Sequence, residues 1–343
     1  MRKFSDYMSE WLYKSEGYYT SFRSIGKDGD FYTAVSSSMF FGGSIAKRVI
    51  SVIEEGFLPE DSLIVEVGAH KGYLLADMVQ FIYSLRPDLL KSLRFAVVEP
   101  FEQNRVAQKN YFKDSFGDAV KFEIYEDFKN LKNESAFVVA NEIFDAFSCE
   151  LVKDEKMLYV KNDEFLFEKM DEFTKRIVKK YSISKGEVAR GYEEFATTLF
   201  DTFKRYEFVS FDYGDLRKRE DFSIRIYHKH QTIPFFALTD FVEDSAQKIE
   251  DISLEELFKK SDITYDVHFD HLIDAFKKSG AILVEFKTQL AMLVEFGIIE
   301  LLELLQKNTD EKSYMSELNR AKLLIDPAFM GERFKGVIFR KTG

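Results

Sequence analysis

The chain has 343 residues, of which 45% are hydrophobic and 16% aromatic, so it is long enough to bury a large core. Its 48 basic and 59 acidic residues give a net charge of −11 at pH 7. A negative potential of this size repels phosphate backbones and anionic membrane surfaces, which argues against nucleic acid as a partner and favours a cationic one.

The cysteine content and the hydropathy pattern point to a soluble cytoplasmic protein. Cys149 is the single cysteine, so no intramolecular disulfide can form and a reducing compartment is expected. The opening segment MRKFSDYMSEW lacks the unbroken apolar core of a signal peptide. The most apolar stretch, residues 281–305, is interrupted by charged side chains and reads as amphipathic helices, so no membrane insertion is predicted.

The first half of the chain changes from a lid-like opening to an alternation of strands and helices. Residues 1–60 are expected to form an N-terminal lid and helix. Residues 61–148 are the first part of the core, with strands at SLIVEVG, LRFAVVEP and FVVANE and helices at KGYLLADMVQFIYSL and QNRVAQKNYF. Continuous apolar strands between amphipathic helices are typical of a parallel sheet covered on both faces.

The second half interrupts this core and then completes it. Residues 149–205 are predicted to be an inserted segment, because CELVKDEKMLYVKNDEFLFEKM alternates like an antiparallel ribbon and GYEEFATTLFDTFKRY is helical. The core continues over 206–236 with the strand YEFVSFDYG, a helical lobe covers 237–325, and 326–343 holds the final strand FKGVIFRK. The predicted fold class is α/β, with a doubly wound, Rossmann-like core and a mostly parallel sheet.

The expected carboxyl ends of the strands carry the first candidate site. Glu66 ends the first strand and is followed by Gly68, an arrangement that suits a ligand with an ammonium group. Glu99 ends the second strand, where an acid accepts hydrogen bonds from ribose hydroxyls in dinucleotide folds. We therefore predict a nucleotide-like cofactor at this edge of the sheet.

The glycine spacing distinguishes two kinds of cofactor loop. A dinucleotide fingerprint that starts at Gly68 needs glycines where His70 and Tyr73 stand, which disfavours a nicotinamide-dependent enzyme. The spacing of Glu66, Gly68 and Gly72 better fits a loop that binds S-adenosylmethionine. His70 is open to two interpretations: a loop residue in ordinary backbone geometry whose ring rims the pocket, or a direct cofactor contact.

A second candidate constellation follows the third strand in VVANEIFDAF. Glu142 and Asp145 could bind a cationic substrate and orient its nitrogen, or they could be a surface acid and a helix cap. The spacings His228-x-His230 and His268-x-x-His271 could suit a metal, but no convincing third ligand accompanies either pair. No metal site is predicted.

Several segments in the same order resemble one family, the MidA-like S-adenosylmethionine-dependent methyltransferases, which includes a mitochondrial complex I assembly factor that methylates a protein arginine. They are EGYYT, GDFYT, VEVGAHKG, ANEIFDAF, FDYG, IRIYHKH, DITYDVHF, TQLAMLVEFGI and MGERFKGVIF. The sequence departs from the family where His70 replaces a glycine, at Val35-Ser36, at Gly42-Gly43 and at His268.

The resemblance implies a class I methyltransferase core and a role for each matching residue. Cofactor-binding residues would be Glu66, Gly68, Ala69, His70, Gly72, Glu99 and Asn141, with Gly29, Asp30, Phe31 and Thr33 as a lid. Asn141, Glu142 and Asp145 would face the substrate, and the last two would be catalytic.

The leading hypothesis is a methyltransferase that acts on an arginine of a protein, for which the resemblance suggests a respiratory complex I subunit. The alternative is a non-catalytic binding or assembly factor that retains the fold, a hypothesis motivated by the changed loop and lid. The sequence leaves open whether the chain forms a homodimer.

Overall fold

The computed structural model describes all residues except 21–32, 132, 163, 218, 242–248 and 250. The chain divides into two units. Unit 1 comprises Met1–Phe31, Phe144–Glu194 and Gly214–Leu272, and unit 2 comprises Tyr32–Ile143, Phe195–Tyr213 and Ile273–Gly343. The six segments expected from the sequence stay a prediction at the level of domains; residues 237–272 of the expected helical lobe belong to unit 1 and residues 273–325 to unit 2.

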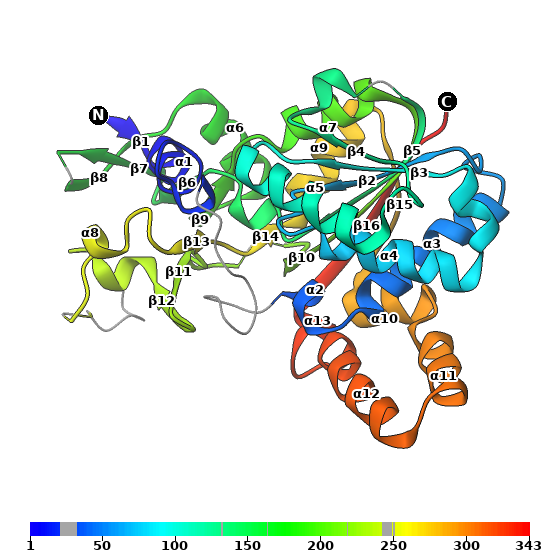
Figure 1. Ribbon diagram of the computed structural model, residues 1–343. Coiled ribbons are helices and arrows are strands. Elements are labelled where there is room, and N and C mark those ends of the chain that lie inside the picture. Colours follow the sequence, from blue (N-terminus) through cyan, green and yellow to red (C-terminus); the bar gives the residue numbers. More distant parts are fainter. Residues whose placement is uncertain (21–32, 132, 163, 218, 242–248, 250) are drawn as a thin grey trace. The chain divides into compact units, whose positions relative to one another are not determined.

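The central feature of unit 2 is a mostly parallel sheet in the order β15-β16-β10-β5-β2-β3-β4 (Figure 1). Its strands are β2 (Leu63–Val67), β3 (Arg94–Val98), β4 (Phe122–Tyr125), β5 (Asn133–Asn141), β10 (Phe203–Asp215), β15 (Ile282–Thr288) and β16 (Phe334–Lys341). β4, β3, β2, β5 and β10 are parallel, whereas β16 runs antiparallel to both of its neighbours. This confirms the expected α/β class with a doubly wound core.

The register brings the carboxyl ends of the parallel strands to one edge. Val67 of β2 lies opposite both Val98 of β3 and Ala140 of β5, and Asn141 lies opposite Phe211 of β10. The residues that follow these strands therefore come together at one edge of unit 2, the place at which open parallel sheets bind ligands.

Helices cover both faces of this sheet, as the continuous apolar strands predicted. The helices that lie wholly or mostly in unit 2 are α2 (Ala34–Ser37), α3 (Phe40–Glu54), α4 (Tyr73–Leu85), α5 (Glu102–Phe116), α7 (Tyr192–Thr202), α9 (Phe269–Ser279), α10 (Gln289–Glu295), α11 (Ile298–Asn308), α12 (Glu311–Ile325) and α13 (Met330–Arg333). Figure 1 shows α3 beside α4, with which it is in contact.

Two phenylalanines of β10 show how the faces are covered. Phe211 packs edge-on against Phe41 of α3, with 5.1 Å between the ring centroids. Phe208 stacks on Phe276 of α9 at 5.2 Å. Because the two β10 residues are an odd number of positions apart, their side chains leave opposite faces of the strand. Both faces are therefore buried under helices.

Two parts of the sheet differ from the sequence expectation. β4 was not predicted, because FEIY is short and none of its side chains is fully buried. Residues 281–305 were expected to be helical throughout, but Ile282–Thr288 form β15, which pairs with β16, before α10 begins. The helical prediction for this segment is therefore wrong, while the expected final strand is confirmed as β16.

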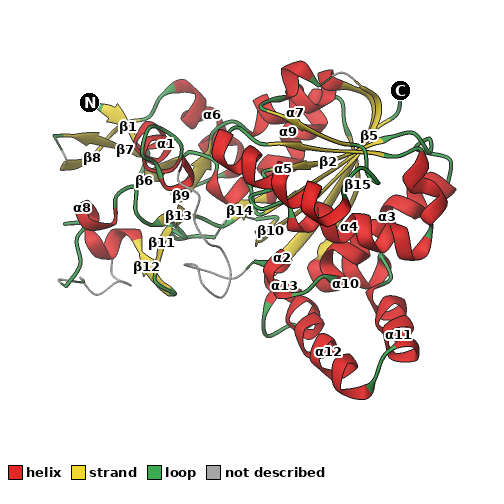
Figure 2. Cartoon of the chain, viewed as in Figure 1, coloured by secondary structure: helices red, strands yellow, loops and turns green. Residues whose placement is uncertain are grey.

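Unit 1 contains two smaller sheets (Figure 2). One has the order β1-β7-β6-β9, with β8 paired to β7, and the other the order β12-β11-β13. Their bounds are β1 (Arg2–Lys3), β6 (Cys149–Lys153), β7 (Lys156–Lys161), β8 (Glu164–Lys169), β9 (Lys185–Ala189), β11 (Arg225–His228), β12 (Gln231–Pro234) and β13 (Asp262–Thr264). The antiparallel pairing of β6, β7 and β8 confirms the ribbon expected in the inserted segment.

The remaining elements of unit 1 are short. They are α1 (Phe4–Leu12), α6 (Glu172–Tyr181), α8 (Leu254–Leu257) and β14 (Val267–His268). Short 3-10 helices occur in both units at Tyr18–Thr20, Pro87–Lys91, Phe128–Asn130, Phe144–Ala146 and Phe235–Leu238. Across the described ranges, no helix is long and apolar enough to cross a membrane.

Candidate functional site

The loop between β2 and α4 contains three residues in left-handed backbone conformations. Gly68 has φ 70°, His70 φ 45° and Gly72 φ 79°. The amide of Gly72 donates a hydrogen bond of 2.6 Å to the carbonyl of Ala69, which closes the turn directly before α4. The expectation of ordinary backbone geometry at His70 is therefore wrong. A non-glycine residue held in this region costs about 1–2 kcal/mol relative to glycine.

The two glycines are required for space as well as for conformation. A Cβ atom on Gly68 would lie 3.1 Å from Cγ2 of Ile143, and one on Gly72 would lie 3.2 Å from the ring of Phe112. The loop backbone thus passes close to its neighbours, as expected for a loop that brings its N–H groups towards a ligand.

Glu66 lies under this loop rather than on its surface. Its side chain is buried, and Oε2 accepts a hydrogen bond of 3.1 Å from the amide of Leu75 in the first turn of α4. Burial raises the pKa of Glu66 to about 8, with further contributions from the negative charges of Asp77 and Glu99. A ligand that brings a positive charge near this carboxyl would favour its ionised form.

Glu99 is also buried, at the end of β3. Its Oε1 accepts a hydrogen bond of 3.1 Å from the amide of Phe101, and its Oε2 accepts one of 3.4 Å from Nε2 of Gln108. Burial raises the pKa of this carboxyl, and these donors oppose the shift together with the side chain of Asn104. Asn104 and Gln108 both lie on the buried face of α5.

Three buried side-chain oxygens at this edge accept no hydrogen bond from the described part of the chain: Oδ1 of Asn104, Oε1 of Gln108 and Oδ1 of Asn141. An amide oxygen buried without a donor costs about 1–3 kcal/mol. A ligand with hydroxyl and amine hydrogens would remove this penalty. The site is therefore built to accept hydrogen bonds.

Glu142 follows β5 in a left-handed conformation, with φ 52°. Its amide donates a hydrogen bond of 2.9 Å to the carbonyl of Phe211 on β10. Its Oε1 accepts one of 2.7 Å from Nδ2 of Asn141 and one of 3.2 Å from the amide of Ala34. A glutamate in this region is uncommon, and such strain clusters at functional sites.

The predicted lid residues are described only in part. The hydroxyl of Thr33 accepts a hydrogen bond of 3.1 Å from the amide of Ser36 and caps α2, which begins at Ala34. Gly29, Asp30 and Phe31 lie outside the described residues.

The structure places the two predicted catalytic acids in different units. Glu142 belongs to unit 2, whereas Asp145 belongs to unit 1, in the 3-10 helix Phe144–Ala146. Asp145 is buried, and together with Asp262 its charge adds to the effect of burial in raising the pKa of Tyr13. Tyr13 stacks on Tyr19, with 5.7 Å between the ring centroids.

The histidine pairs have protein contacts of their own. Nδ1 of His228 lies 2.9 Å from Oγ of Ser261, and Nε2 of His271 lies 3.4 Å from Oε1 of Glu193. Among the residues that the structure describes, no group of three or more histidine, cysteine, aspartate or glutamate side chains could hold a metal ion.

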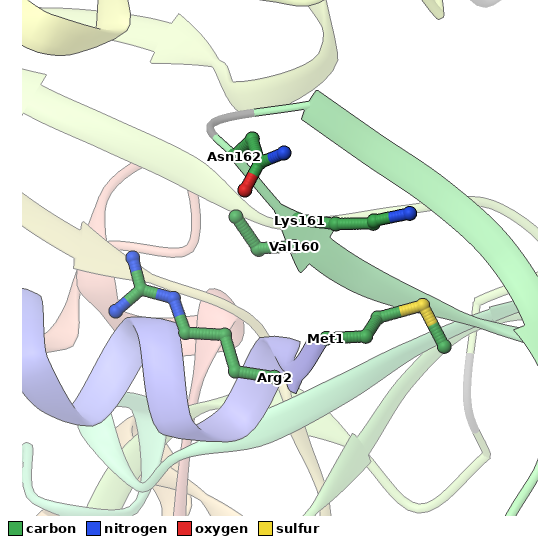
Figure 3. Close-up of a pocket in the computed structure, with 5 residues that line it drawn as sticks. All are labelled: Met1, Arg2, Val160, Lys161 and Asn162. Carbon is green, nitrogen blue, oxygen red and sulfur yellow. The ribbon is translucent and has the colours of Figure 1, made fainter.

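An open pocket of about 380 Å³ lies in unit 1 at the pairing of β1 with β7 (Figure 3). It is lined by Met1, Arg2, Val160, Lys161 and Asn162, and by none of the predicted site residues. Neither acids nor glycine turns converge there, so it plays no part in the candidate site.

The sequence pattern did not indicate Asn104, Gln108 or Ala34 as site residues. The first two stand four positions apart, as do Gln108 and Phe112, and all three of these α5 residues are buried. That spacing marks one helical face, but polar residues are normally expected on the exposed face. Ala34 contributes only its backbone amide, for which no sequence signal exists.

The chain is similar in sequence to known proteins. Residues 44–286 match the model of a family described as "Putative S-adenosyl-L-methionine-dependent methyltransferase". The mitochondrial protein arginine methyltransferase NDUFAF7 of Xenopus laevis is 26% identical over 367 aligned positions, covering 96% of this chain and 79% of that protein. Its Drosophila melanogaster homologue is 25% identical over 158 positions, covering 41% of this chain and 36% of the homologue.

A solved structure has the same fold over almost the whole chain. It is a COG1565 superfamily member and likely methyl transferase from Burkholderia thailandensis, bound to S-adenosyl-homocysteine. The TM-score is 0.81 at 22% identity, covering 99% of this chain and 88% of that one.

Proposed function

The chain belongs to the family of S-adenosyl-L-methionine-dependent methyltransferases, and from this premise we propose that it methylates an arginine of a protein substrate. The catalytic part of the proposal is supported by the geometry of Glu142 directly after β5. Its backbone is left-handed, and its carboxylate accepts a hydrogen bond from Asn141.

The edge of the sheet in unit 2 fits the cofactor. S-adenosylmethionine carries ribose hydroxyls and amine hydrogens, which match the buried acceptor oxygens of Asn104 and Asn141. We assign the ribose to the carboxylate of Glu99, and the turn formed by Gly68, Ala69, His70 and Gly72 to the approach of backbone N–H groups. We assign Glu66, which is buried beneath the turn, to the positively charged ammonium of the methionine part of the cofactor.

Methyl transfer needs little from the protein beyond position and proton removal. When bound, S-adenosylmethionine would supply a methyl group for in-line attack by a nucleophile, with the bond from the methyl carbon to the sulfonium sulfur breaking and S-adenosylhomocysteine as the leaving group. An arginine guanidinium is protonated at physiological pH, so its attacking nitrogen must lose a proton as the new N–C bond forms. We assign that proton to Glu142, whose carboxylate is held by Asn141 and by the amide of Ala34.

The substrate assignment rests on charge and on the named activity of the relatives. The net charge of −11 attracts a cationic partner. In unit 1, Asp145 and Asp262 lie beside the stacked rings of Tyr13 and Tyr19, and the hydroxyl of Tyr19 donates a hydrogen bond of 3.0 Å to Asp262. Carboxylates and aromatic faces both attract a guanidinium. We therefore propose that this group of acids and tyrosines in unit 1, including Asp145, attracts a guanidinium.

The changed loop was the main reason to consider a non-catalytic assembly factor. Because His70 keeps the left-handed conformation that a glycine would adopt, the change does not by itself argue for lost function. The changed lid then remains as a ground for considering the assembly factor.

The test is transfer of a labelled methyl group. The purified protein is incubated with methyl-labelled S-adenosylmethionine and lysate from cells that lack it, and mass spectrometry then locates the label. Label on a protein arginine, absent with Glu142→Gln, is the expected result. Label on another residue type would overturn the substrate assignment. Cofactor binding without any labelled protein would favour the assembly factor.

A further inference from the structure

Gln108 occupies a buried position between two parts of the cofactor site. It lies on α5, its side chain has no exposed surface, and Asn104 and Phe112 flank it on the same helical face. Below it, Phe112 stacks on Phe122 of β4, with 3.8 Å between the ring centroids. The helix face that carries Gln108 is therefore fixed against the sheet.

The amide nitrogen of Gln108 makes two hydrogen bonds to groups that are distant in sequence. Nε2 lies 2.9 Å from the carbonyl oxygen of His70 and 3.4 Å from Oε2 of Glu99. A carbonyl and a carboxylate both accept hydrogen bonds, so the nitrogen and not the oxygen of the amide must face them. One side chain thus connects the glycine loop to the acid at the end of β3.

His70 is the residue of this loop that needs such a connection. The other two left-handed residues, Gly68 and Gly72, adopt positive φ without penalty, whereas His70 does not. The hydrogen bond from Gln108 is made to the carbonyl of His70 itself, so it restrains the backbone directly after the unfavourable φ angle. A single buried hydrogen bond is comparable in strength to the penalty.

We propose that Gln108 is a positioning residue that holds His70 in its left-handed conformation and couples the loop to Glu99. Its hydrogen bond would offset the conformational penalty that a glycine at position 70 would not have. This inference rests on the proposed binding of S-adenosylmethionine at the same loop. It assigns Gln108 a role in cofactor affinity and none in the proton transfer.

The test is a double-mutant cycle between positions 108 and 70. Gln108→Met keeps the length of the side chain and removes its polar atoms, and His70→Gly makes the left-handed conformation free of strain. Calorimetry with S-adenosylhomocysteine measures the dissociation constant of each protein. Gln108→Met should weaken binding about tenfold when His70 is present and less than threefold in the His70→Gly protein. Equal weakening in both backgrounds, or none in either, would overturn the proposal.

Two further measurements separate positioning from general damage. In steady-state assays Gln108→Met should raise KM for S-adenosylmethionine and leave kcat within about twofold, because the proposal gives it no part in chemistry. Without cofactor, hydrogen exchange of the peptide that contains residues 68–73 should be faster in Gln108→Met than in the unaltered protein. Unchanged exchange would contradict the proposal independently of any cofactor.

The cycle also distinguishes this inference from the proposed function. If neither the unaltered protein nor His70→Gly binds S-adenosylhomocysteine, the cofactor assignment fails, whereas the exchange measurement still decides the role of Gln108. If Gln108→Met does not fold, Gln108→Leu replaces it in every measurement, because it also removes the polar atoms and adds no charge beside Glu99.

Discussion

Nδ2 of Asn141 donates a hydrogen bond of 2.7 Å to Oε1 of Glu142, although the two residues are neighbours in sequence. Successive side chains of a strand point to opposite faces and do not normally meet. Glu142 directly follows Asn141, the last residue of β5, and its left-handed conformation, with φ 52°, ends that alternation and lets the two side chains turn towards each other.

This relationship predicts a separation of binding from catalysis. Glu142→Gln should lower kcat by at least about 100-fold, since it removes the group that accepts the proton, and should change the affinity for S-adenosylhomocysteine by less than about threefold. Glu99→Gln should instead weaken that affinity, because Glu99 is assigned to the ribose. Calorimetry and a methylation assay on both variants check this, and the reverse pattern would overturn both assignments.

Asn141 should act through Glu142. Asn141→Ala removes one of the donors that hold the carboxylate, so kcat should fall about tenfold. The same substitution in the Glu142→Gln protein should have little further effect, since the carboxylate that Asn141 holds is already gone. Methylation assays on the two single variants and the double variant measure the coupling; independent, multiplying losses of kcat would contradict the prediction.

The requirement for glycine in the cofactor loop has a matched control in the same unit. Gly72→Ala and Gly56→Ala both place a side chain at positive φ, 79° and 73°, so each should lower the free energy of unfolding by about 1 kcal/mol. A Cβ atom on Gly56 has no neighbour within 4 Å, whereas one on Gly72 would lie 3.2 Å from Phe112.

Only Gly72→Ala, the variant in the loop, should therefore change the affinity for the cofactor. Gly72→Ala is expected to weaken S-adenosylhomocysteine binding by more than about tenfold, because the loop must shift, while Gly56→Ala leaves it unchanged. Urea unfolding and calorimetry give the two quantities. Normal binding by Gly72→Ala would show that the tight turn is not needed.

The sequence predicted the strands and helices around the site better than the contacts within it. Glu66, Gly68, Gly72 and Glu99 stand where an apolar run ends, so spacing alone indicated their positions. The left-handed conformation of His70 and its contact with Gln108 depend on α5 packing beside the loop, a tertiary relationship that no local pattern encodes.

The misassigned strand β15 has a different physical cause. Residues 282–288 run into α10 without a glycine or proline, so the apolar pattern continues across the boundary. The break is made by Thr288, whose hydroxyl accepts a hydrogen bond of 3.3 Å from the amide of Ala291 and caps α10. Pairing of Ile282–Thr288 with β16 then selects the strand conformation.

The buried carboxyl of Glu66 should make stability depend on pH. Its pKa is about 8 in the folded protein, against 4.5 for the ordinary group, because burial disfavours the charge. Between these values the folded state binds more protons than the unfolded state, so the free energy of unfolding falls as pH rises. The protonated Glu66 therefore makes its full contribution to the free energy of unfolding below about pH 4.5, and this contribution is lost as the pH rises through 8.

Glu66→Gln removes this titration while keeping the shape of the side chain. The free energy of unfolding of the variant minus that of the unaltered protein should therefore increase from pH 5 to pH 8, by up to about 1.4 kcal/mol per pH unit. Urea unfolding at unit steps of pH measures the difference. Glu172→Gln is the control: hydrogen bonding to Lys175 lowers the pKa of this exposed acid, so its difference should not rise over the same range. If the free energies of unfolding of the unaltered protein and Glu66→Gln change with pH in parallel, Glu66 is already ionised beneath the loop at neutral pH.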